Sequence, residues 1–159
     1  MPKEIERKFI VATDTWRNNI EDKTPMCQGY IRSLDCTVRV RVAGTTGYLT
    51  LKGRTSNFTR DEYEYEIPLQ DAKEMLNKLC HGGSVEKFRY RIIVDGDEWV
   101  VDEFIGKNAG LIMAEIELTA ENQSFSTPEW LGKEVSHDSR YTNGALAMKP
   151  FSTWSRSCK

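Results

Sequence analysis

The chain has 159 residues, and its 22 lysines and arginines nearly cancel 24 aspartates and glutamates, which gives a formal net charge of −2. This length suits one domain with a sizeable core. The near-zero balance argues against a nucleic-acid-binding protein, which needs a surplus of Lys and Arg. The 10% of aromatic residues argues against an acidic, disordered chain.

Eight segments alternate apolar and polar residues with the period of two that is typical of β-strands. They span residues 4–11, 26–33, 37–43, 47–53, 60–67, 85–95, 97–104 and 111–119. A tight hairpin is expected at Asp95-Gly96. Eight strands with few helices favour a mainly β (α+β) fold, namely an eight-stranded antiparallel closed barrel.

Three shorter segments are expected to be helical. Residues 69–80 place apolar side chains at three- and four-residue steps, so one face of this helix should pack on the outside of the barrel. Pro128 follows Ser126 and Thr127 and predicts the first turn of a second helix that ends at Val135. A short helical turn is expected at residues 143–148.

The chain shows no internal repeat or linker, so we expect a single domain over residues 1–159. Its barrel core would span about 4–119, and a C-terminal helical segment would span about 126–148. The N-terminus has no apolar run, so neither a signal peptide nor a membrane span is expected. The four cysteines form no CxxC pair and favour reduced thiols in the cytoplasm: Cys27, Cys36, Cys80 and Cys158.

The second face of the predicted strands is ionic rather than merely polar. Its cations are Lys8, Arg39, Arg41, Lys52, Arg60, Lys87, Arg89 and Arg91. Its anions are Glu4, Glu6, Glu62, Glu64, Glu66, Asp102, Glu115 and Glu117. Such faces could simply be solvated, with cross-strand pairs contributing about 0.2–1 kcal/mol each. Neighbouring like charges repel, however, and Arg and Glu are not favoured in strands, so we predict that the ionic faces turn inward and line a tunnel.

This lining has a definite chemistry. Guanidinium and ammonium groups suit phosphate oxygens, whereas carboxylates suit hard divalent cations. Together they indicate a site for a phosphate chain with Mg²⁺ or Mn²⁺, in which the metal would bridge the two sets of oxygens and activate the reacting group. The sequence contains no glycine-rich phosphate loop and no Ser or Cys nucleophile with a partnered His.

The order of the motifs resembles the CYTH superfamily, the triphosphate tunnel metalloenzymes. Glu4-Ile5-Glu6-Arg7-Lys8 is similar to the E-x-E-x-K signature of that family. The other similar segments follow in order as Gln28-Gly29-Tyr30, Val38-Arg39-Val40-Arg41, Thr50-Leu51-Lys52, Arg60-Asp61-Glu62-Tyr63-Glu64, Glu86-Lys87-Phe88-Arg89, Asp102-Glu103-Phe104 and Ala114-Glu115-Ile116-Glu117. Residues 130–143 resemble the C-terminal segment of short bacterial members.

The resemblance implies roles for these residues. The catalytic set would be Glu4, Glu6, Lys8, Lys87, Glu117 and Tyr30. The main metal ligands would be Glu4, Glu6 and Glu117, with further acidic contacts from Glu62, Glu64, Asp102 and Glu115. The phosphates would be held by Lys8, Arg39, Arg41, Lys52, Arg60, Lys87 and Arg89. Arg91 and Glu66 lie at strand ends and are weaker candidates, and Arg140 and Tyr141 would either close one tunnel end or only pack.

The resemblance favours metal-dependent hydrolysis of tripolyphosphate to diphosphate and phosphate. The alternatives are a class IV-type adenylate cyclase or a thiamine or nucleoside triphosphatase, and, from another class, a non-catalytic polyphosphate or nucleotide sensor. The expected partner is a small polyphosphate, with neither nucleic acid nor membrane, and the protein is expected to be a monomer or a homodimer.

Overall fold

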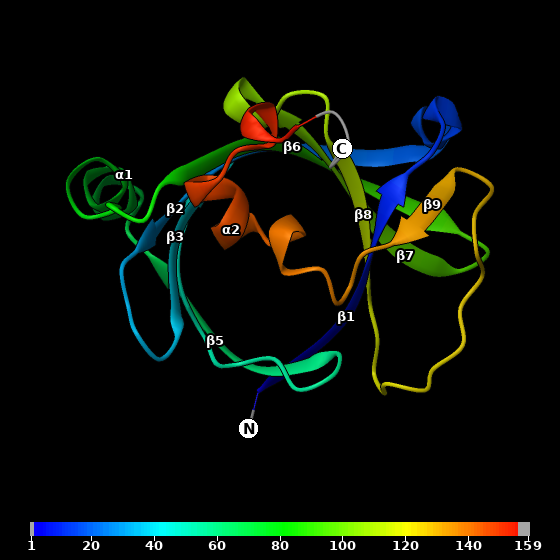
Figure 1. The fold of residues 1–159 in the computed structure, drawn as a ribbon, viewed down its shortest axis with the longest axis horizontal. Helices are drawn as coiled ribbons and strands as arrows, with labels where there is room; N and C mark the ends of the chain where they lie inside the picture. The colour runs from blue at the N-terminus through cyan, green and yellow to red at the C-terminus, as the bar shows by residue number, and fades with distance from the viewer. Residues whose placement is uncertain (1, 156–159) are drawn as a thin grey trace.

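The computed structural model describes residues 2–155. Its strands form one antiparallel sheet in the order β5-β4-β3-β2-β6-β7-β8-β1-β9, and an additional β1–β5 pairing closes the first eight into a barrel (Figure 1). The strands are β1 Lys3–Val11, β2 Ile20–Ile31, β3 Thr37–Ala43, β4 Thr46–Lys52, β5 Thr59–Ile67, β6 Ser84–Val94, β7 Asp97–Ile105, β8 Ile112–Glu117 and β9 Leu131–Glu134. The closed eight-stranded barrel is confirmed.

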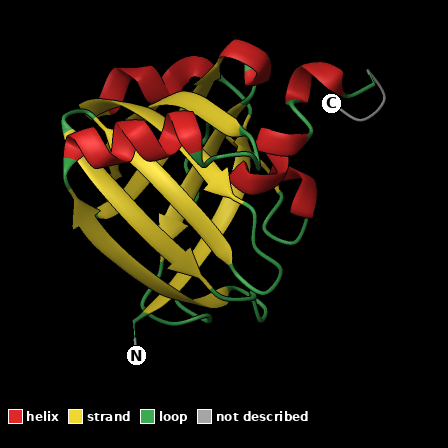
Figure 2. Cartoon of the chain, turned by 90° about the vertical axis from the view of Figure 1, so that its left-hand side faces the viewer, coloured by secondary structure: helices red, strands yellow, loops and turns green. Residues whose placement is uncertain are grey.

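The helical elements lie outside the wall or at one end of the barrel (Figure 2). They are α1 Leu69–Lys78 and α2 Asn143–Met148, with 3-10 turns η1 Asp14–Asn19, η2 Gly106–Asn108, η3 Ser139–Tyr141 and η4 Phe151–Thr153. α1 packs on β2, β3 and β4. Close approach there depends on small residues, because a Cβ atom on Gly47 would lie 2.8 Å from the Cβ of buried Ala72.

Strand β2 begins earlier than the predicted residue 26. Its first half, from Ile20, pairs with β6, with a shift in register between Ile20 and Asp22. These residues are mostly exposed, so the polar sequence carries no apolar alternation from which a strand could be recognised.

The predicted helix that ends at Val135 is wrong, because this segment contains strand β9. The Val135 amide donates to the Lys8 carbonyl at 2.8 Å, and Arg7 forms an ion pair with Glu134. Gly132 allows the two strands to approach, since a Cβ there would lie 2.7 Å from the Ile10 carbonyl oxygen. Pairing with a distant strand therefore overrides the local helix signal. The short helix at 143–148 is confirmed as α2.

Strand β1 has different partners along its length. It pairs with β5 over Lys3–Ile5 and with β9 over Phe9–Val11, while β8 occupies the opposite edge over Glu6–Ile10. The barrel is thus closed by only the first residues of β1, and β9 covers the edge that β5 leaves open.

The apolar core lies on both sides of the barrel wall. The outer cluster contains Phe9, Trp16, Tyr90, Ile92, Trp99, Val101, Ala114, Ile116, Leu118 and Trp130. A second cluster joins inward-facing Val85, Phe104 and Met113 to Tyr141 and Leu146 of the C-terminal segment. Because the first three share strand faces with Lys87, Asp102 and Glu115, this cluster fills one end of the barrel interior, where Figure 1 shows α2 across the ring of strands.

None of the helices in residues 2–155 combines the length and apolar character that crossing a membrane requires. Cys27, Cys36 and Cys80 are free thiols, as predicted, whereas Cys158 lies outside the described residues.

Candidate active site

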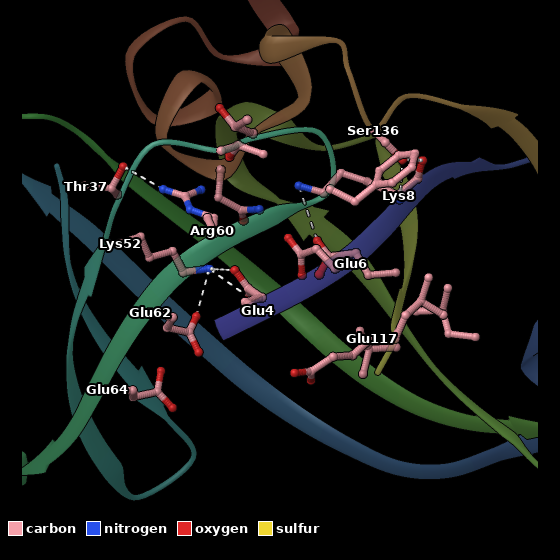
Figure 3. Close-up of a pocket in the computed structure, with 18 of the residues that line it drawn as sticks. Glu4, Glu6, Lys8, Thr37, Lys52, Arg60, Glu62, Glu64, Glu117 and Ser136 are labelled. Atoms are coloured by element: carbon pink, nitrogen blue, oxygen red, sulfur yellow. Dashed lines mark hydrogen bonds and ion pairs between the residues drawn. The ribbon is translucent and has the colours of Figure 1, made fainter. Parts of the chain in front are cut away.

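The barrel encloses a cavity of about 840 Å³, here called the tunnel (Figure 3). It is lined by all residues of the predicted catalytic, metal-binding and phosphate-binding sets except Asp102: Glu4, Glu6, Lys8, Tyr30, Arg39, Arg41, Lys52, Arg60, Glu62, Glu64, Lys87, Arg89, Glu115 and Glu117. The ionic strand faces therefore point inward, as their alternation predicts. Arg91 and Glu66, the two weaker candidates, do not line the tunnel.

Several opposite charges pair across the tunnel wall. Lys52 of β4 lies 2.9 Å from Glu4 and 3.1 Å from Glu62, and thereby joins β1, β4 and β5 (Figure 3). Lys8 lies 3.4 Å from Glu115 on the neighbouring strand β8. Although burial alone would raise it, the pKa of Glu115 is lowered to about 2 by Lys8 and Arg89. These pairs keep the tunnel ionic in spite of its burial.

Asp102, which the resemblance implies is a further acidic metal contact, pairs with two tunnel cations. Its side chain is 2% exposed and accepts hydrogen bonds from Lys87 at 2.7 Å and from Arg89 at 2.8 Å through both carboxylate oxygens. Against the effect of burial, Arg89 and Lys87 hold the pKa of Asp102 well below its usual range. Asp102 therefore lies behind the tunnel surface and orients two cations that reach it.

Lys87 is the most deeply buried of the tunnel cations, with 1% of its surface exposed. Burial, followed by repulsion from Arg89 and Arg41, lowers its pKa to about 7 in spite of Asp102. The ammonium also donates to Asn143 Oδ1 at 2.9 Å. Lys87 thus connects the tunnel wall to α2 at the end of the barrel that the second apolar cluster fills, here called the closed end.

Of the carboxylates in the predicted metal-binding set, two have no cationic partner within ion-pair distance among the described residues. Glu6 and Glu117 are opposite each other in the β1–β8 register. Burial, followed by repulsion from Glu115, raises the pKa of Glu6 to about 8. Burial, followed by repulsion from Glu4 and Glu62, also raises the pKa of Glu117. The ionised forms of both side chains are therefore unfavourable without a bound cation.

Oxygen ligands and excess negative charge are what a hard divalent cation prefers, so the acidic side chains fit such an ion. Within residues 2–155, no group of three acidic, His or Cys side chains is already gathered as a metal site. Glu4 and Glu62 are held by Lys52, which leaves Glu6 and Glu117 as the acids free to bind a cation.

Two of the predicted tunnel cations are likewise unmatched. Among the described residues, Arg41 and Arg60 have no carboxylate within ion-pair distance. Arg60 donates to Thr37 at 3.2 Å, while its buried Nε has no hydrogen-bond partner. Arg41 donates through Nε to Gln28 at 2.9 Å. Their remaining donors suit an anion with several oxygens.

Some tunnel residues were not predicted. Thr37 shares a strand face with Arg39, so strand alternation could have identified it. Asn57, Ser136 and Asn143 also line the tunnel, but they come from segments without a strand period, so strand alternation could not place them there.

The structure places Arg140 and Tyr141 next to each other but in different surroundings. Tyr141 is buried in the cluster that fills the closed end, whereas Arg140 pairs with Asp138 at 2.7 Å. Neither lines the tunnel, whose α2 end is instead formed by Thr142, Asn143 and Gly144.

A closed antiparallel barrel with opposed sets of cations and carboxylates inside it defines a tunnel protein that binds charged ligands in its interior. The chain belongs to the CYTH domain family, whose model matches residues 2–145. It is 47% identical to an inorganic triphosphatase of Acetivibrio thermocellus over 152 residues, which cover 95% of this chain and 97% of that relative.

Two further comparisons agree with this assignment. An inorganic triphosphatase of Nitrosomonas europaea is 38% identical over 150 residues, which cover 91% of this chain and 97% of the relative. A crystal structure of an inorganic triphosphatase matches with a TM-score of 0.68 at 36% identity, covering 93% of this chain and 96% of the other.

Proposed function

We propose that this protein hydrolyses tripolyphosphate to diphosphate and phosphate with Mg²⁺ or Mn²⁺. The observation that carries the proposal is the coexistence of unmatched cations and unmatched carboxylates in one tunnel. A phosphate chain supplies what Arg41 and Arg60 lack, and a divalent cation supplies what Glu6 and Glu117 lack. Two relatives that align over most of their length are named inorganic triphosphatases, which supports the same substrate.

The cationic faces of β3, β4, β5 and β6 would bind the phosphates. Arg39, Arg41, Lys52, Arg60, Lys87 and Arg89 surround the tunnel. Arg89 is held by Asp102, and Lys87 by both Asp102 and Asn143. Such fixed donors stabilise charge that develops on phosphoryl oxygens without reorganising during the reaction.

The metal would be held by Glu6 and Glu117, with Glu4 as the third ligand. When bound, a divalent cation neutralises phosphate charge and increases the electrophilicity of the phosphorus atom. The chain's own contribution is to place Glu6 and Glu117 opposite each other on neighbouring strands of the tunnel wall, where burial and neighbouring carboxylates oppose their ionisation. Lys8, paired with Glu115, would hold a phosphate beside them. The free cysteines among the described residues, Cys27, Cys36 and Cys80, suit a reducing compartment such as the cytoplasm.

A substrate panel tests this function. Release of phosphate is measured with tripolyphosphate, ATP, thiamine triphosphate and diphosphate, each with Mg²⁺, with Mn²⁺ and with EDTA, and ATP samples are also assayed for cyclic AMP. Tripolyphosphate with metal should be the best substrate. If no phosphate is released from tripolyphosphate with either metal, the hydrolase assignment is contradicted. Binding without turnover would identify a sensor. Cyclic AMP formed at a comparable rate would identify a cyclase.

A Glu117→Gln variant is the matched control because it keeps the shape of the side chain and removes its charge. Turnover should fall by at least about 100-fold, as is typical when a charge-stabilising group is removed, while tripolyphosphate still binds. Unchanged turnover would remove Glu117 from the metal site.

A further inference from the structure

Gln28 is a fully buried polar side chain that the sequence analysis names only as part of a motif, without predicting a role for it. It lies on β2 with 0% of its surface exposed and does not line the tunnel. The next residue, Gly29, faces α1, since a Cβ there would contact Cys80 and Leu76. Strand alternation therefore turns Gln28 toward the barrel interior, directly behind the tunnel wall.

The amide of Gln28 joins two residues that do line the tunnel. Its Oε1 accepts from Arg41 Nε at 2.9 Å, and its Nε2 donates to the Tyr30 hydroxyl oxygen at 2.8 Å. Arg41 is opposite Gln28 in the β2–β3 register, and Tyr30 follows two positions later on the same face of β2. One buried side chain thus holds both tunnel residues.

Chemistry fixes the direction of these bonds. Arg41 Nε–H can only donate, so the amide oxygen of Gln28 must face it. The amide NH₂ then faces Tyr30 and can only donate, so the Tyr30 oxygen must accept. The hydrogen of the Tyr30 hydroxyl cannot be used on Gln28, and no second partner of this hydroxyl is present in residues 2–155. It is therefore free to donate to a tunnel ligand.

Arg41 is prepared in the same way. Gln28 occupies Nε, which leaves the terminal N–H groups of Arg41 free at a surface that lines the tunnel. The bond to Gln28 is neutral, so Arg41 keeps its full charge for a ligand. Burial, followed by repulsion from Arg39 and Arg89, lowers the pKa of Arg41 to about 9, so the guanidinium remains charged at neutral pH.

We infer that Gln28 is a positioning residue that makes Tyr30 and Arg41 a donor-only pair for the phosphoryl oxygens of the substrate. This inference rests on the proposed polyphosphate substrate. A neutral amide is required because it accepts on one side and donates on the other. A carboxylate of the same shape would neutralise Arg41 and, because it only accepts, would force Tyr30 to donate away from the tunnel.

The test compares Gln28→Glu with Gln28→Met. Methionine removes both hydrogen bonds and keeps the volume, whereas glutamate keeps the shape and reverses the polarity. Binding of tripolyphosphate is measured by calorimetry in EDTA, and kcat and KM are measured with Mg²⁺. We expect roughly tenfold weaker binding for Gln28→Met, the loss of about one net hydrogen bond. We expect roughly 100-fold weaker binding for Gln28→Glu, which also loses a cation.

A purely structural role predicts the reverse order, because glutamate would pair with Arg41 and preserve the packing. Binding by Gln28→Glu that equals or exceeds that of Gln28→Met would therefore overturn the inference. Gln70→Glu, the same substitution on the exposed surface of α1, controls for net charge and should bind as wild type does. Circular dichroism and thermal unfolding verify that the variants are folded.

A second measurement covers the case in which Gln28→Glu does not fold. In a Tyr30→Phe background, Gln28→Met should weaken binding by a smaller factor than in the wild type. The hydrogen bond between Gln28 and the Tyr30 hydroxyl is already absent there, so only the bond to Arg41 can be lost. Equal factors in the two backgrounds would contradict action through Tyr30. If the wild type binds tripolyphosphate without turnover and the predicted order holds, the hydrolase proposal fails and the role of Gln28 stands. If the wild type does not bind tripolyphosphate at all, both fail.

Discussion

Glu6 of β1 and Glu117 of β8 are opposite each other in an antiparallel register, and neither has a cation within ion-pair distance among residues 2–155. Burial, followed by repulsion from Glu115, opposes the ionisation of Glu6, and this is an unfavourable term in the metal-free protein. At a fixed pH of 7.5, Glu6→Gln should therefore raise the free energy of unfolding of the metal-free protein by roughly 1–3 kcal/mol, while turnover is lost.

The response to metal distinguishes this explanation from a simple packing effect. Millimolar Mg²⁺ should raise the melting temperature of the wild type, since a ligand that binds only the folded state stabilises it. It should raise that of Glu6→Gln much less. An equal shift in both proteins would place the metal away from Glu6.

Neutralising Asp102 should lower the free energy of unfolding, whereas neutralising Glu6 should raise it. Asp102→Asn leaves buried Lys87 without an anion and leaves Arg89 with only Glu115, at 3.9 Å. The loss of one partner of a buried pair costs about 3–5 kcal/mol. Chemical denaturation measures the loss. The matched control is Glu98→Gln, which breaks the half-exposed Arg91–Glu98 pair of 3.5 Å and should cost less than about 1 kcal/mol. Equal losses in the two variants would contradict the structural role assigned to Asp102.

The contrast between these acids also explains how far sequence reasoning reaches. Strand alternation places a residue on the inner or the outer face, and this was enough to predict the barrel and the lining of its tunnel. Alternation does not predict whether an inward-facing side chain reaches the surface of the tunnel or stays buried behind other side chains. Asp102 and Glu115 both face inward, but only Glu115 lines the tunnel. Alternation cannot predict this difference, and the metal contact expected of Asp102 stays a prediction.

The β9 segment was mispredicted for a related reason. Pro128 and the residues before it favour a helix start locally, whereas the actual strand is specified by β1, more than 120 positions earlier in the chain. The Val135–Lys8 hydrogen bond and the close approach at Gly132 are long-range features that no local period reports.

A substitution at Gly83 tests whether the position of α2 at the closed end of the tunnel matters for stability and turnover. It has φ of +90°, and a Cβ atom there would overlap the carbonyl of Ala147 in α2. Gly83→Ala should therefore displace α2 and disturb the Lys87–Asn143 contact, with a loss of stability above the roughly 1–2 kcal/mol of a left-handed alanine alone and a loss of turnover. Thermal unfolding and phosphate release measure the two effects.

Gly96 is a control for backbone strain. Its φ is +83°, but nothing lies within 4 Å of a Cβ placed there. Gly96→Ala should show the strain without the displacement, and its turnover should stay near that of the wild type. A Gly83→Ala variant that resembled Gly96→Ala in both measurements would mean that α2 does not depend on this contact.

The attachment of β9 to β1 should depend on pH. Arg7 donates to Glu134 at 2.8 Å, and this hydrogen bond holds the pKa of Glu134 below its ordinary value of 4.5. A carboxyl whose pKa is lowered on folding stabilises the folded state above the unfolded pKa, and this contribution is lost as the pH falls through the folded pKa. Glu134→Gln should therefore cost about 1 kcal/mol at pH 7, and the difference from the wild type should disappear as the pH falls below 4.5 toward the lowered pKa. Urea denaturation of both proteins between pH 3 and 7 measures this difference, and a gap that stayed constant over that range would show that the charge of Glu134 does not hold β9 in place.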